Sequence, residues 1–292
     1  MFVEFKHSVR GYLGQILGWG IGLALLGLLL VSMFDSLADQ MESYQQIIDN
    51  FPREFTAFLG GLDTMATPEG FVAIEFFSYM PLILGIFAIQ AGAGLLVRDE
   101  EEGILDLIIA HPVSRAGLFW GRYLAFLFAL AAVLFIAWLG IIVPMGWSSM
   151  DLGWMEAARP FLSLYAEMVI FGSATLFLSM LLPSQRLASM GGGLLLVASF
   201  FINGFAELNE NLESAARFSP LKYYQTQDAF AGLNREWFLG LLAAALVFAL
   251  LAWWWFLRRD LRVGGEGGWR PGQLIDFMKR FRRGKAITSS RS

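Results

Sequence analysis

Six apolar stretches, each long enough to cross a bilayer as a helix, constrain this 292-residue chain more than any other feature. A helix needs roughly 20 apolar residues to span the hydrocarbon core. Charged residues make up only 16% of the chain, whereas ordinary soluble domains carry about a quarter. We therefore predict an all-α membrane protein with six transmembrane helices, over residues 13–34, 72–97, 117–143, 160–182, 188–206 and 237–257.

The distribution of lysine and arginine orients these spans. Six spans put both termini on one side, and that side holds 16 of the 21 basic residues. The other side holds five bases, and its longest connection, residues 35–71, carries seven acids and one base. Because short loops rich in Lys and Arg stay in the cytoplasm, we expect cytoplasmic N- and C-termini in a multi-pass protein of the cell (inner, cytoplasmic) membrane.

Two amphipathic segments flank the spans. Apolar residues recur at helical spacing before the first span, at Phe2, Phe5, Val9 and Tyr12. This spacing favours an interfacial elbow helix over residues 1–12, with a frayed terminus as the alternative. We divide the chain into a transmembrane domain, 1–258, and a basic amphipathic cytoplasmic tail, 259–292, which either binds anionic lipid or is solvated.

The most polar run between two spans is RDEEEGILDLIIAHPVSR, residues 98–115. A helix over residues 99–110 would have four acids in its first turn, where the helix dipole favours negative charge. Pro112 would end this helix, and Ser114 is placed to cap the next span. The alternative is a solvated loop. However, the apolar side of such a helix needs a cover, either a partner protein or inner-leaflet lipid.

The segment VRDEEEGILDLIIAHPVSRAGLFWGRYLA, residues 97–125, resembles the first cytoplasmic loop of ABC-2 type permeases, the membrane subunits of a class of ABC transporters. The matching positions are Glu101, Gly103, Leu105, Asp106, Pro112, Val113, Ser114, Arg115, Gly121 and Arg122. Ile104 departs from the pattern, because threonine is usual there. The six spans, the elbow helix and a Ser-Pro-aromatic stretch at residues 219–224 extend the resemblance in outline.

The resemblance implies that residues 99–110 are a coupling helix that docks on a cytoplasmic ABC ATPase subunit dimer. The residues assigned to this coupling are Glu100, Glu101, Glu102, Gly103, Leu105, Asp106, Ile108, Ile109, Pro112, Ser114 and Arg115. The chain has no Walker A loop of its own, since its Gly284-Lys285 pair is followed by Ala286. The partner subunit would therefore bind ATP and Mg²⁺, and we expect no cofactor or metal in this chain.

Six spans are half the usual complement of such a transporter, so the resemblance also implies a second copy of this chain or a similar permease. Glycine ridges let membrane helices approach closely. The candidate dimer contacts are Gly14, Gly18 and Gly22 in the first span and Gly191, Gly192 and Gly193 in the fifth.

Glu167 is the one acid well inside a predicted span, and ionisable residues at such depth are usually functional or paired. We consider it a candidate for the substrate path, with weaker candidates at Gln90 and Asn203. The alternative for Glu167 is a carboxyl that reaches the interface or bonds to a neighbour. Arg122 is expected to extend to the inner headgroups.

These features favour the permease subunit of an ABC exporter, which is not itself an enzyme. The alternative is a non-transporting sensor, signalling or assembly subunit that works with an ATPase. An intramembrane hydrolase is disfavoured, because the chain has no cysteine and neither His7 nor His111 lies in a span. The expected partners are the ATPase, a second permease and the lipid bilayer, and no nucleic acid.

Overall fold

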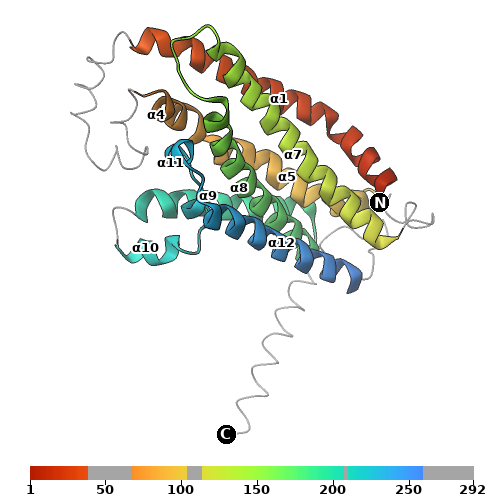
Figure 1. Ribbon diagram of the computed structural model, residues 1–292. Helices are drawn as coiled ribbons and strands as arrows, with labels where there is room; N and C mark the ends of the chain where they lie inside the picture. The colour runs from red at the N-terminus through yellow and green to blue at the C-terminus, as the bar shows by residue number, and fades with distance from the viewer. Residues whose placement is uncertain (39–66, 104–113, 207–209, 259–292) are drawn as a thin grey trace.

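The computed structural model describes residues 1–38, 67–103, 114–206 and 210–258, and every regular element in these ranges is a helix (Figure 1). Six of these described helices are long and apolar enough to cross a membrane, which confirms the predicted number of spans. They are α1 (Phe2–Ala38), α5 (Met80–Glu101), α7 (Arg115–Met145), α8 (Trp154–Leu181), α9 (Gln185–Ala206) and α12 (Arg235–Arg258).

The six long helices alternate in direction. Glu101, at the end of α5, bonds to the backbone of Gln185 at the start of α9. Phe256, near the end of α12, packs on Phe119 near the start of α7. The starts of α1, α7 and α9 and the ends of α5, α8 and α12 therefore share one face of the bundle, which we call the N-terminal face. The opposite ends form the distal face.

Short elements gather at the distal face (Figure 1). They are α4 (Pro68–Val72), the π-helix η2 (Ala73–Phe77), α10 (Glu210–Ala216), the 3-10 helix η3 (Pro220–Tyr223) and α11 (Gln227–Ala231). The second span, expected from residue 72, begins instead at Met80. The chain breaks there because Pro81 lacks a backbone N–H and fits only the first turn of a helix.

α1 and α7 pack in parallel along their lengths (Figure 1). Small residues bring the two backbones together: a Cβ added at Gly20 would lie 2.9 Å from the Cδ1 atom of Ile136. A Cβ added at Gly27 would lie 2.8 Å from Cγ1 of Ile141, and one at Gly140 would overlap the backbone of Ala24. Close backbone approach at small residues is a common basis of helix pairing in membranes.

α1 is a single continuous helix, so the prediction of a separate elbow helix over residues 1–12 is wrong. No proline interrupts the helix near residue 12, and Gly11 and Gly14 both lie within it. The first turns pack on α7 instead, where the rings of Phe5 and Phe128 meet edge to face with centroids 6.0 Å apart. This packing supports the straight extension of the helix.

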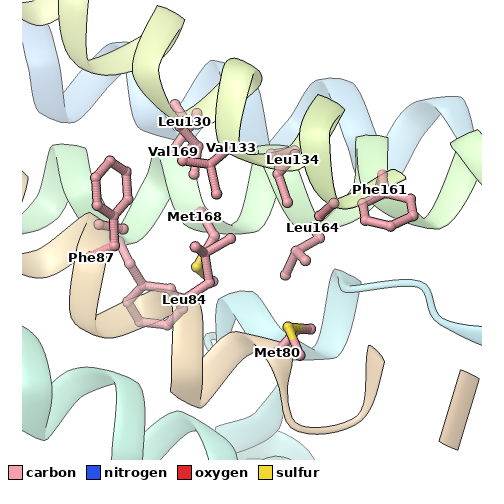
Figure 2. Close-up of a cluster of buried hydrophobic side chains, with 14 of the residues drawn as sticks. Met80, Leu84, Phe87, Leu130, Val133, Leu134, Phe161, Leu164, Met168 and Val169 are labelled. Atoms are coloured by element: carbon pink, nitrogen blue, oxygen red, sulfur yellow. The ribbon is translucent and has the colours of Figure 1, made fainter. Parts of the chain in front are cut away.

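α8 is the central helix, with α5, α7, α9, α11 and α12 packed around it. A Cβ at Gly92 of α5 would overlap the carbonyl oxygen of Gly172, so α5 and α8 cross in close contact. On both sides of this crossing along the helix axes, buried apolar side chains fill the space between helices. Figure 2 shows part of this core, formed between α5, α7 and α8 by Met80, Leu84, Phe87, Leu130, Val133, Leu134, Phe161, Leu164, Met168 and Val169.

Candidate functional site

The acids of the predicted coupling helix belong to the end of α5. This helix runs to Glu101, and Gly103 follows with φ 70°, a left-handed conformation that suits glycine and ends a helix. The predicted helix start at residue 99 is therefore wrong. Residues 104–113, which include Leu105, Asp106, Ile108, Ile109 and Pro112, lie outside the described residues, and their helix stays a prediction.

Negative charge is unfavourable at the C-terminal end of a helix, and the α5 acids are offset by positive partners. Glu102 forms an ion pair with Arg98 at 3.1 Å, an exposed pair that contributes little. Glu101 accepts a hydrogen bond at 2.7 Å from the backbone N–H of Gln185. That N–H is one of the unpaired amides at the start of α9, so Glu101 acts as an N-terminal cap for another span.

Arg122 is the centre of a buried ion cluster and is only 8% exposed, so the expectation that it extends to the headgroups is wrong. Its Nε donates to Glu4 of α1 at 2.9 Å, and its Nη2 donates to Asp99 of α5. Its Nη1 donates to the carbonyl of Leu95 at 3.0 Å. The rigid five-donor fork of arginine suits such a three-way contact, which ties α1, α5 and α7 together.

Ser114 caps α7, as predicted from the sequence. Its Oγ accepts a hydrogen bond at 3.0 Å from the backbone N–H of Gly117, and Arg115 is the first residue of the helix. Residues 104–113 are thus bounded by two anchored helix ends. Arg122 joins the end of α5 to the start of α7, and Ser114 fixes the point at which α7 begins.

A polar cavity of about 320 Å³ lies beside the Arg122 cluster, between α1 and α5. Gln90, a predicted substrate-path residue, lines it from α5. The polar lining also includes His7, Tyr12, Gln15, Arg98, Asp99 and Gln185. The volume falls in the range usual for small-molecule sites, but such sites are mostly lined by apolar side chains, whereas this lining is mainly polar.

Glu167 lies near the middle of α8 and is 0% exposed. The span predicted over residues 160–182 would place it seven residues from one end, but α8 begins at Trp154. Neither carboxyl oxygen of Glu167 has a hydrogen-bond partner among the described residues. A buried polar group without a partner costs stability, so this side chain is a strong candidate for a function.

The three substrate-path candidates are not brought together. Gln90 lies near the middle of α5, Glu167 lies near the middle of α8, and Asn203 is half-buried near the distal end of α9. Gln90 lines the polar cavity, whereas Glu167 and Asn203 are not part of its lining. Their assignment to a substrate path stays a prediction.

The six dimer-contact candidates divide into open and enclosed positions. Among the described residues, Cβ atoms added at the glycines of the first span, Gly14, Gly18 and Gly22, would have no neighbour within 4 Å outside their own helical turn, and the same holds for Gly193. Gly192 is buried against Thr175 of α8, and Gly191 lies beside Leu178. The ridge on α1 is therefore free to receive another helix, whereas Gly192 packs within its own chain.

The sequence profile of the ABC-2 family transporter proteins matches residues 4–261, which is most of the chain. This chain belongs to the ABC-2 transporter family. It is accordingly the multi-pass membrane subunit, or permease, of an ABC transporter, and it associates with an ABC ATPase. No curated protein matches the sequence of this ABC-2 permease.

Sequence reasoning missed two members of the ion cluster of the permease, Glu4 and Asp99. Both pair with Arg122, which the family pattern had singled out. The available signal was the depth of Arg122, seven residues into α7, where a charged side chain needs either solvent or a partner. Nothing local to residues 4 or 99 indicates that they supply this partner, because each contact joins two different helices.

Proposed function

We propose that this permease is one half of an ABC exporter, driven by separate ATPase subunits that dock on residues 104–110 and the adjoining end of α5. The Arg122 cluster carries this proposal. It joins the two helix ends that flank the docking segment, and it adds the start of α1 to the same unit. A displacement applied by the ATPase to this segment would therefore move three spans together.

Helix contacts outside the Arg122 cluster can transmit such a displacement to other spans. The Gly92–Gly172 crossing couples α5 to the central helix α8, and the glycine contacts of α1 with α7 keep those two helices in register. The Glu101 cap extends the connection to α9. Close-packed interfaces of this kind move as rigid bodies or change between discrete arrangements, and do not deform continuously.

The cytoplasmic assignment of the N-terminal face and the export direction rest on charge and on the polar cavity. Of the basic residues that the structure describes, more lie at helix ends of the N-terminal face than at the distal face, as expected for the cytoplasmic side: Lys6, Arg10, Arg98, Arg115, Arg122, Arg186 and Arg258. The cavity lined by Gln90 lies on the same side, between α1 and α5, where cargo from the cytoplasm would enter. Release at the distal face would complete export.

The docking proposal predicts that the double substitution Leu105→Asp and Asp106→Lys lowers the amount of co-purified ATPase about tenfold, equivalent to about 1.4 kcal/mol. The substitutions remove an apolar contact and reverse a charge without touching the described anchors. Pull-down of the tagged permease with its ATPase, together with ATP turnover, measures the effect. The control is Glu213→Lys, an exposed position on the distal α10. Unchanged ATPase recovery in the double variant would refute docking at this segment.

The dimer proposal predicts that Gly18→Trp converts most of the permease from dimer to monomer. The indole would fill the groove along which a second α1 could approach, while a Cβ at residue 18 has no neighbour within 4 Å from other described elements of the same chain. Native mass spectrometry in detergent gives the ratio of the two species. Leu246→Trp, on the exposed side of α12, is the control and should remain dimeric. A Gly18→Trp protein that stays dimeric places the interface elsewhere.

A further inference from the structure

Glu167 is a fully enclosed carboxyl group with no partner in a bundle whose other buried charge, Arg122, is completely paired among the described residues. The ion pairs of the described residues do not include Glu167. A carboxylate in such surroundings is unstable, so in this arrangement the group is neutralised by a proton. A cationic group that pairs with this carboxyl group would take the place of the proton.

The chain segment after α10 enters the bundle beside Glu167. The backbone N–H of Gln225 donates to Ser163 Oγ at 2.8 Å, one turn from Glu167 on α8. Tyr224 donates through its hydroxyl to the carbonyl of Phe77 at 3.0 Å. Burial raises the pKa of the Tyr224 hydroxyl well above its usual range, and a negative charge on Glu167 raises it further. Tyr224 is therefore within electrostatic reach of the carboxyl group.

An apolar crevice of about 310 Å³ lies between α8, η3 and α12, and Glu167, which is fully enclosed, lies behind its lining and is not part of it. Ile170, one helical turn from Glu167, lines it together with Tyr223, which precedes Tyr224. The remaining lining is aromatic and aliphatic, from Phe218, Trp237, Leu241 and Ala244. Among the residues that the structure describes, the one charged lining residue is an acid, Glu236, and no base lines the crevice.

We propose that Glu167 and this crevice form a binding site for a hydrophobic cation, with the apolar body in the crevice and the cationic group on the Glu167 carboxylate. The inference rests on the proposed export function and names a class of cargo for it. Binding exchanges one positive charge for another: the cation pairs with the carboxylate, and the carboxyl proton leaves to water. Aromatic rings at Tyr223 and Trp237 add a favourable face for a cation.

The charge of the lining selects this occupant over other apolar molecules. An anion would meet Glu167 and Glu236 without a base in the lining, and its burial would be strongly unfavourable. A neutral lipid chain would fill the crevice but would leave Glu167 without a partner. A cation with an apolar body satisfies both parts of the site at once, which neither alternative does.

The test uses the full-length permease in lipid nanodiscs and tetraphenylphosphonium, an apolar cation, with tetraphenylborate as an anion of the same shape. Titration calorimetry gives Kd, and repetition in buffers of different ionisation enthalpy counts the protons released. Glu167→Gln is the test variant because it keeps the size of the side chain without the charge. Glu156→Gln is the matched control, an exposed acid on the same helix.

The wild-type permease and Glu156→Gln should bind the cation and not the anion, with proton release on binding. Glu167→Gln should bind the cation at least tenfold more weakly, without proton release, and should be at least as heat-stable as the wild type. Retention of cation affinity in Glu167→Gln overturns the inference, as does equal binding of the anion. Because no ATPase is needed, these results are independent of whether the ATPase docks on residues 104–110.

Discussion

Replacement of Arg122 by leucine is expected to destabilise the permease by about 3–5 kcal/mol, the cost of breaking a buried ion pair by removing one partner. The substitution leaves Glu4 and Asp99 facing each other in a largely enclosed space without their common cation. It also removes the bond to the Leu95 carbonyl. Unfolding by SDS in mixed micelles, followed by tryptophan fluorescence, measures the loss in the free energy of unfolding.

Two controls separate stranded charge from lost packing. Arg98→Leu breaks an exposed ion pair with Glu102 and should change stability by less than about 0.5 kcal/mol. Adding Glu4→Gln and Asp99→Asn to Arg122→Leu removes the stranded charges and should recover most of the loss. A single Arg122→Leu variant as stable as Arg98→Leu would show that the cluster does not hold the three helices together.

Gly92→Val is expected to lower the free energy of unfolding by about 3 kcal/mol, the upper end of the range for overpacking. Even a methyl group at this position would overlap the carbonyl oxygen of Gly172, and backbone atoms cannot rotate away as a side chain can. Relief requires α5 and α8 to move apart, which opens the core shown in Figure 2. The same SDS titration measures the loss.

Gly18→Ala provides the comparison for Gly92→Val, because the added methyl group at residue 18 has no neighbour within 4 Å from another helix in the part of the chain that the structure describes. Its stability should match or slightly exceed that of the wild type, since alanine favours helix over glycine. If both variants unfold at the same SDS concentration, the close crossing of α5 and α8 is not a main determinant of stability.

The helices of this permease could be predicted because hydropathy and capping are local properties. The six predicted apolar stretches correspond to six long helices. The cap formed by Ser114 was predictable because this residue directly precedes the apolar stretch that forms α7. The errors are local as well. Residues 99–101 were assigned to a new helix because acids favour helix starts, but Gly103 with its left-handed backbone ends α5 after them.

The candidate site could be predicted only in part, because its groups come from different helices. Glu4, Asp99 and Arg122 are separated by up to 118 residues in the chain, and hydropathy does not encode which spans are neighbours. The glycines show the same limit. Every-fourth spacing drew attention to Gly18, whereas the equally periodic Gly20, Ala24 and Gly27 make the contact with α7. The pairing of two helices depends on the complementary shapes of their surfaces, and the sequence of one helix alone does not show which helix fits it.

The parallel pairing of α1 and α7 has a consequence for biogenesis. Parallel helices cannot be joined by a tight turn, so α5 must be inserted between their syntheses, and Gly20 cannot meet Ile136 until more than 100 further residues have been made. During that interval the groove on α1 is exposed to lipid or to the insertion machinery. The order in which the spans are synthesised therefore determines when α1 of this permease can pack against α7.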